Sequence, residues 1–284
     1  MEFEKVGTQQ LTLMIIGLCL FLIVPLIIAI IWKLVKKERF STILVGAVTF
    51  LLFALILEKP IQNVLVFPTQ MGLPDHAAAR FINARPILWA FLVGLFPGVF
   101  EETGRLIAFK TVLGKRKNRE TSVSYGIGHG GFEVMLILGL TYISNISYAF
   151  MINSGAFEAV VEQAKALAPE QADQAYAVAA QLATFSLSDL GIGVFERIFA
   201  FLFHVGASIL VFYACKERKK FWLYPLAILL HTLTDMTAAL YMKEALPLSQ
   251  WGLNIFVAVF GALTFFGAYF LLYRKDTVDP EDPS

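Results

Sequence analysis

Ionisable residues lie inside four long apolar stretches of this sequence, where charged groups are costly. A charge in such a segment faces protein or water, so it is a candidate functional residue. One buried histidine or carboxylate is more often a structural hydrogen-bonding group, but here several recur together. They are Glu101, Glu102 and Arg105 in FEETGR, His129 and Glu133 in GIGHGGFE, His204 and Ser208 in FHVGAS, and His231 and Asp235 in HTLTD.

The spacing of these groups predicts that they meet at one level of a membrane. His129 and Glu133 are four residues apart, as are His231 and Asp235, so each pair shares one face of a helix. At ~1.5 Å per helical residue, the acids and imidazoles lie roughly 12–21 Å from the nearest basic cluster. The hydrocarbon layer is about 30 Å thick. We therefore expect a polar layer near its middle.

The chemistry that suits this set is hydrolysis of an amide bond. A carboxylate in a low-dielectric site becomes a competent general base for water. Imidazoles beside it can hold the water or stabilise an oxyanion on the substrate carbonyl. Arg105 can keep one of the two adjacent glutamates ionised. We predict an enzyme that needs no cofactor and acts on a membrane protein or peptide.

Three alternatives stay open at this point. Zinc is the other way to generate hydroxide, and His129, Glu133, His204 and His231 offer enough ligands for an open zinc site. No HExxH motif occurs, and we favour the metal-independent mechanism. A proton-coupled transporter also uses acids and histidines near the midplane, although the sequence has no internal repeat. A non-catalytic scaffold or immunity factor is the third alternative.

Seven apolar stretches are long enough, or nearly so, to span a membrane and position these residues. They cover 11–32, 41–57, 86–113, 121–143, 188–215, 221–242 and 251–273. Lys and Arg clusters follow the first, third, fifth and seventh stretches. This alternation predicts an extracytoplasmic N-terminus and a cytoplasmic C-terminus. Glu196 and Arg197 fall about two turns outside the polar layer, and we expect them near the outer boundary of the membrane.

These features predict an all-α, polytopic membrane helix bundle of about seven transmembrane helices, forming a single integral membrane domain over 1–284. Its catalytic core is expected at 86–242 and a lipid-skimming connection at 59–85. An extracytoplasmic insertion at 154–186 is expected to form amphipathic helices that could gate access. The acidic tail 276–284 is expected to be disordered.

Composition narrows the function classes further. Hydrophobic residues make up 57% of the 284 and charged residues 16%, which is too apolar for a soluble globule. The net charge of +1 excludes a nucleic-acid partner, and Cys19 and Cys215 predict neither a disulfide nor a cysteine metal site. The lipid bilayer is the expected surrounding, in a bacterial plasma membrane. The sequence specifies no oligomeric state.

Four motifs, taken in order, resemble a known family. EETGR, the run from Tyr125 to His129, and HTLTD are similar to motifs of the CAAX-protease and bacteriocin-processing superfamily of intramembrane glutamate proteases. FEETGR, GIGHGGFE, FHVGAS and HTLTD together resemble most closely the bacterial YhfC family of intramembrane proteases, with the PrsW proteases as more distant relatives. The similarity extends from about residue 86 to 242.

The resemblance implies a role for each matched residue. Glu101 would be the catalytic base, supported by Glu102 and partnered by Arg105. His129 and His231 would position water or stabilise the oxyanion. Asp235 would take the place of the Asn or Asp that binds the substrate carbonyl in the superfamily. A role for His204 is implied only by the resemblance to the YhfC family. Apart from the resemblance, we expect Glu133, Tyr125 and Ser208 to support the site. The arginine lies one residue closer to the glutamates than in prenyl-protein proteases, Tyr125 replaces a Phe and Glu133 is additional, so prenylated substrates are not expected.

Overall fold

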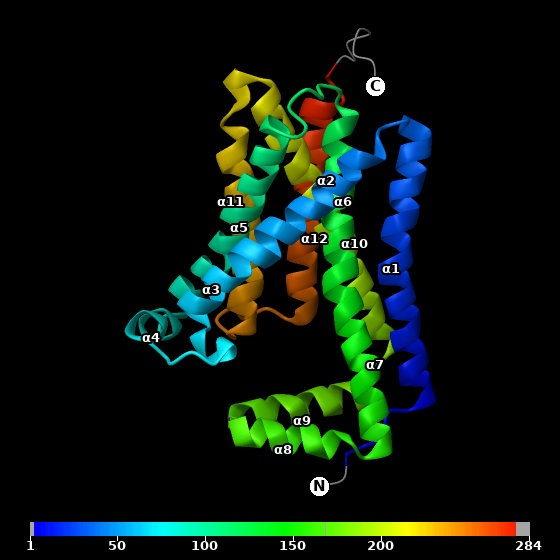
Figure 1. The fold of residues 1–284 in the computed structure, drawn as a ribbon, viewed down its shortest axis with the longest axis vertical. Helices are drawn as coiled ribbons and strands as arrows, with labels where there is room; N and C mark the ends of the chain where they lie inside the picture. The colour runs from blue at the N-terminus through cyan, green and yellow to red at the C-terminus, as the bar shows by residue number, and fades with distance from the viewer. Residues whose placement is uncertain (1–2, 168, 277–284) are drawn as a thin grey trace. The chain divides into compact units, whose positions relative to one another are not determined.

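A computed structural model describes residues 3–167 and 169–276, and no strand occurs among them (Figure 1). The helices are α1 (Thr8–Lys36), α2 (Phe40–Phe50), η1 (Leu51–Glu58), α3 (Lys59–Val66), η2 (Pro68–Met71), α4 (Ala77–Asn83), α5 (Pro86–Lys110), α6 (Glu120–Glu133), η3 (Val134–Leu138), α7 (Gly139–Ser154), α8 (Phe157–Leu167), α9 (Pro169–Ala183), α10 (Leu187–Lys216), η4 (Arg218–Lys220), α11 (Leu223–Met242), α12 (Gln250–Ala268) and η5 (Tyr269–Tyr273). Of the tail predicted at 276–284, all but Asp276 lies outside the described residues. Asp276 Oδ2 accepts hydrogen bonds from Tyr213 Oη at 2.6 Å and Lys216 Nζ at 2.5 Å.

Seven helical segments of the described chain are long and apolar enough to cross a membrane, which confirms the predicted fold class. The second segment covers Phe40–Val66 and is longer than the predicted 41–57. It continues because the π-helix η1 and then α3 follow α2 without interruption. Pro60 lies in the first turn of α3, inside this continuous segment, and supplies no N–H to the helix. The connection predicted from residue 59 therefore begins only after Val66.

Contacts divide the chain into two compact units. The first comprises residues up to Ile27 together with Val134–Phe195, and the second comprises Ile28–Glu133 together with the chain from Glu196 onward. The first unit contains the two helices expected at 154–186, α8 and α9, which pack against each other. Their apolar faces are buried, including Phe157 and Val161 of α8.

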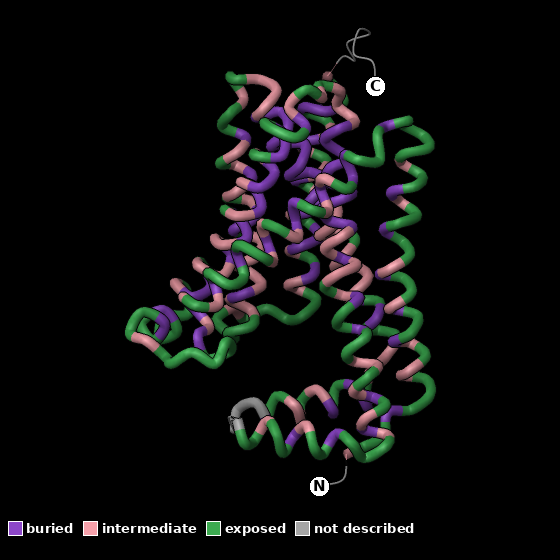
Figure 2. Tube along the Cα trace, viewed as in Figure 1, coloured by how far each residue is buried: buried purple, intermediate pink, exposed green. Residues whose placement is uncertain are grey.

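The second unit contains every residue that the sequence placed in the polar layer. Its buried residues gather where α5, α6, α10 and α11 converge (Figure 2). The most extensive helix contacts in this unit are between α5 and α11 and between α2 and α6. Glycine permits the α2–α6 approach, because a Cβ at Gly128 would overlap the carbonyl of Ile43, and one at Gly46 would overlap that of Tyr125.

A proline interrupts the hydrogen bonding of α5 one turn before the glutamates. Pro97 lacks an N–H, so the carbonyl of Val93, four residues earlier, has no helical donor. Gln62 of α3 replaces that donor, since its Nε2 lies 3.2 Å from Val93 O. Gln62 is itself buried and accepts a hydrogen bond from Lys59 Nζ at 3.3 Å. The end of the second span is thereby attached to the interruption in α5.

Candidate active site

Four helices of the second unit bring the predicted site residues together. Helix α5 carries Glu101, Glu102 and Arg105, α6 carries His129 and Glu133, α10 carries His204, and α11 carries His231 and Asp235. The three histidines, the two adjacent glutamates and the arginine are all buried. The polar layer predicted from spacing is therefore one connected group of side chains.

Arg105 is the centre of this group. It has no exposed surface, and each guanidinium nitrogen has a partner. Nη1 donates to Glu102 Oε1, Nη2 donates to His204 Nδ1 at 2.7 Å, and Nε donates to Ser208 Oγ at 3.3 Å. Glu101 Oε2 lies 3.9 Å from Nη2. One rigid cation thus connects α5 with α10 and neutralises a buried carboxylate.

The two adjacent glutamates have different surroundings. Glu102 is completely buried, and its Oε1 contacts both Arg105 and His231 Nδ1, the latter at 2.8 Å. Glu101 instead lines a cavity and contacts His129 Nε2 through Oε2 at 2.9 Å. Glu102 is therefore suited to orient His231, and Glu101 is the glutamate that a molecule in the cavity would meet.

Hydrogen-bond partners define the protonation of His204. Arginine can only donate, so His204 Nδ1 must accept from Arg105 and the ring proton lies on Nε2. That Nε2 is 2.6 Å from Glu133 Oε2, although off the line of a hydrogen bond. His204 is therefore neutral and has an N–H directed to the cavity side of the site.

His231 and Asp235 together hold a proton. His231 donates from Nδ1 to Glu102, and its Nε2 lies 3.5 Å from Asp235 Oδ2. An unprotonated Nε2 would direct its lone pair at the Asp235 carboxylate, which is repulsive. One proton therefore resides either on His231 Nε2 or on Asp235. The pair can release this proton to a group bound beside it.

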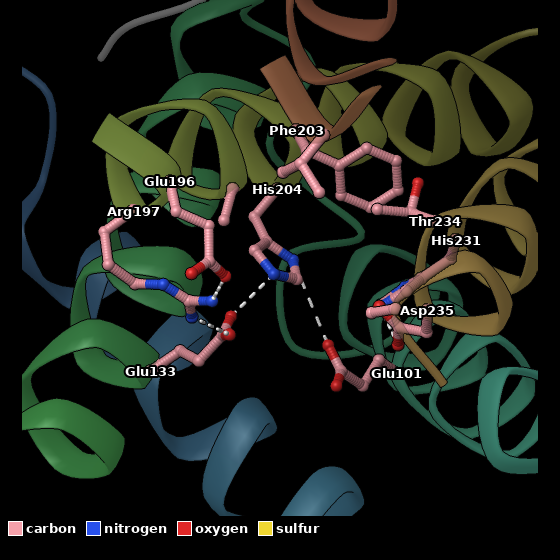
Figure 3. A pocket seen from close by; sticks show the side chains of 12 residues that line it. Glu101, Glu133, Glu196, Arg197, Phe203, His204, His231, Thr234 and Asp235 are labelled. Atoms are coloured by element: carbon pink, nitrogen blue, oxygen red, sulfur yellow. Dashed lines mark hydrogen bonds and ion pairs between the residues drawn. The ribbon is translucent and has the colours of Figure 1, made fainter. Parts of the chain in front are cut away.

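A cavity of about 150 Å³ lies among these side chains (Figure 3). Glu101, His204, His231 and Asp235 line it, together with Glu133. A water molecule takes about 30 Å³ of liquid volume, so the cavity has room for several. The Asp235 side chain is 37% exposed, which indicates that the cavity reaches the surface on that side.

Two cavity residues were not assigned to the site from the sequence. Glu196 and Arg197, expected about two turns outside the layer, also line the cavity. Arg197 pairs with Glu196, and its Nη1 lies 3.6 Å from Glu133 Oε1 (Figure 3). The residue spacing could have assigned Arg197 to the site. Arg197 precedes His204 by seven residues, or two helical turns, and therefore lies on the same face of α10.

The supporting residues Tyr125 and Ser208 lie behind the site. Tyr125 is fully buried, with its ring centroid 4.7 Å from that of Phe109 and 6.0 Å from that of His129. Ser208 accepts from Arg105 and donates to the His204 carbonyl at 2.7 Å. These contacts hold other side chains in place and do not reach the cavity.

A group of donors suited to a metal ion exists at the same place. Glu101, His204 and His231 each offer one ligand atom, and these atoms lie within 4.8 Å of one another. Two histidines and a glutamate are a known zinc donor set. The zinc ligands considered from the sequence also included His129 and Glu133. In the structure His129 contacts Glu101 instead, and Glu133 contacts His204 and Arg197.

The donor chemistry and burial of this group fit zinc, with one reservation. For the fit, Glu102 holds His231 by Nδ1, as carboxylates do behind zinc-bound histidines, and Nε2 faces the cavity residue Asp235. Against it, Arg105 already occupies Nδ1 of His204 and places a permanent positive charge beside the ligand atoms. Zinc binding by Nδ1 of His204 would require Arg105 to move.

Comparisons with known protein sequences and families place the chain among membrane proteases. The chain is 34% identical over 224 residues to the membrane protein YhfC of Bacillus subtilis (strain 168), covering 78% of this chain and 80% of that protein. No solved structure matches the chain. The family model described as YhfC intramembrane metalloprotease matches residues 20–257, which contain all four motifs. This polytopic membrane protein therefore belongs to the YhfC family of intramembrane proteases.

Proposed function

We propose that this protein is a glutamate-type intramembrane endopeptidase of the CAAX-protease and bacteriocin-processing superfamily. It would hydrolyse a peptide bond of a membrane-associated protein or peptide. The observation that carries the proposal is the position of Glu101. Of the two adjacent glutamates it is the one that lines the cavity, and its Oε2 contacts His129 Nε2 at 2.9 Å.

The reaction follows from the groups around that cavity. Glu101 takes a proton from a water molecule as the water oxygen attacks the substrate carbonyl carbon. The N–H of His204 and a protonated His231 donate to the oxyanion that forms. The carbon–nitrogen bond then breaks, and the leaving amine takes the proton held by His231 and Asp235. Glu101 returns its proton to that pair as the products leave.

His129 and Glu102 act as positioning residues in this scheme. His129 holds the Glu101 carboxylate from one side, and Glu102 holds the His231 ring through Nδ1. Arg105 neutralises Glu102 and fixes His204. It thereby keeps the reacting side chains Glu101, His204 and His231 in their arrangement, although Arg105 itself does not contact substrate. Side chains held in this way lose little freedom during the reaction.

The second candidate is a zinc-dependent form of the same protease. The buried group Glu101, His204 and His231 supports it, as does the family's description as a metalloprotease. Bound zinc would lower the pKa of its water and polarise the carbonyl. Elemental analysis of the purified protein, before and after chelator treatment, separates the two mechanisms. Stoichiometric zinc that is lost in His204→Ala and whose removal stops cleavage would establish the zinc form.

The central experiment compares Glu101→Gln with the unchanged protein. Both are reconstituted with bacterial membrane vesicles, and new peptide termini in membrane proteins are mapped by mass spectrometry. We expect new termini with the unchanged protein and none with Glu101→Gln. The matched control is Glu162→Gln, which removes an exposed charge from α8 and should leave cleavage intact. Cleavage by Glu101→Gln at the full rate would contradict the proposal.

A further inference from the structure

A second pocket includes Lys110 of α5. Lys110 follows Glu101 by nine residues, which is about 14 Å along the helix at ~1.5 Å per residue. The pocket has a volume of about 560 Å³ and lies where α5 and α10 end and η4 begins. Its lining consists of Lys110, Ala214, Cys215, Lys216, Arg218 and Phe221. The lining therefore contains three cations and no carboxylate, so its field favours an anion.

The positive charge of this basic pocket is only partly neutralised. Lys216 is paired with Asp276 at 2.5 Å, and the neighbouring Glu217 is paired with Lys220 at 2.6 Å. Within the described part of the chain, no carboxylate lies within 4.0 Å of Lys110 or of Arg218, and both side chains are exposed. Lys110 Nζ lies 4.9 Å from the centre of the Phe221 ring. Two cations therefore remain available to a ligand.

Exposed apolar residues occur close in sequence to residues that line the basic pocket. Ile107, which precedes Lys110 by about one helical turn, is 44% exposed. Val112, two residues after Lys110, is 69% exposed, and Trp222, next to Phe221, is 60% exposed. Exposed apolar residues in a membrane span face acyl chains, and tryptophan is favoured at the level of the headgroups. A soluble phosphate would make no use of this apolar border, whereas a phospholipid would contact both parts.

We propose that the basic pocket is a binding site for the phosphate headgroup of an anionic phospholipid, with Lys110 and Arg218 as its main ligands. The volume is within the range of pockets that bind small molecules. Basic pockets between transmembrane helices are a known form of anionic-lipid site. The acyl chains would lie along the exposed apolar residues of α5. This site is separate from the candidate active site and does not depend on its chemistry.

The test titrates short-chain phosphatidylglycerol into delipidated protein in an uncharged detergent, and native mass spectrometry counts the bound lipid. Lys110→Ala with Arg218→Ala is compared with Lys33→Ala with Lys36→Ala, which removes the same charge from α1. Each basic residue near a lipid surface contributes about 1 kcal/mol, so the pocket variant should bind about thirty-fold more weakly. The α1 variant should bind as the unchanged protein does, and Lys110→Arg with Arg218→Lys should restore binding.

Competition distinguishes the source of the phosphate. We expect neither inorganic phosphate nor short-chain phosphatidylcholine to displace the bound lipid at equal concentration. Displacement by inorganic phosphate would overturn the lipid assignment in favour of a free anion. Equal binding of phosphatidylcholine would overturn the charge argument. Equal losses in the pocket and α1 variants would show diffuse attraction to the basic surface and would overturn the site.

Discussion

Glu101 and Glu102 are adjacent in the chain, yet they contact histidines on two different helices. Glu101 reaches His129 on α6 at 2.9 Å, whereas Glu102 reaches His231 on α11 at 2.8 Å. Glu101 borders the cavity, and Glu102 has no exposed surface. The EE pair thus has one carboxylate that a molecule in the cavity would meet and one that protein encloses completely.

The first prediction separates these two roles by stability. Glu102→Gln leaves the buried Arg105 charge without its carboxylate, which costs about 3–5 kcal/mol of unfolding free energy. Glu101→Gln should change the unfolding free energy far less, because Glu101 lies 3.9 Å from Arg105 and borders a cavity. Denaturant unfolding in a mild detergent measures both variants. Equal losses in the two would contradict the division of roles.

The second prediction concerns the shape of the Arg105 side chain. Lysine keeps the charge but cannot hold Glu102, His204 and Ser208 at once. Arg105→Lys should therefore lower the unfolding free energy by about 1.5–3 kcal/mol and reduce cleavage. Ser208→Ala removes one of these partners and should cost only about 0.5–1.5 kcal/mol. A stability for Arg105→Lys equal to that of the unchanged protein would show that charge alone matters.

The third prediction tests whether Gln62 replaces the donor that Pro97 lacks. Gln62→Leu leaves the Val93 carbonyl without a donor and should cost about 1–2 kcal/mol. In a Pro97→Ala background the backbone N–H of residue 97 serves Val93, so Gln62→Leu should then cost much less. The coupling free energy from this double-mutant cycle is the measurement. Additive effects would mean that Gln62 acts independently of the proline.

The fourth prediction concerns the close approach of α2 and α6. Gly128→Ala places a Cβ against the carbonyl of Ile43 and should lower the unfolding free energy by about 1–3 kcal/mol. The matched control is Gly267→Ala on α12, where no atom lies within 4 Å of the added Cβ. It should keep or raise stability by up to about 1 kcal/mol. Thermal unfolding of both variants is the check, and a neutral Gly128→Ala would contradict the packing argument.

Much of the architecture could be predicted from the sequence. Long apolar runs specify membrane-spanning helices because an unpaired backbone in hydrocarbon is costly, and the part of the chain that the structure describes has seven such helices. The end of the second span could not be placed, because Glu58, Lys59 and Pro60 resemble a connection in sequence. The helix continues through them, since Glu58 is buried inside the protein and Gln62 is attached to α5.

For the candidate site, the sequence by itself determined most of the residues that meet: charges in apolar helices are so costly that Glu101, His129, His204 and His231 had to share one polar interior. Tertiary structure alone decided which of two adjacent glutamates meets the cavity, that Arg105 connects α5 with α10, and that Arg197 joins the site. The physical reason is rotation. Periodicity along one helix gives the relative directions of its side chains, but the angle of each helix about its own axis is set by contacts with segments distant in the chain, such as Gly128 against Ile43.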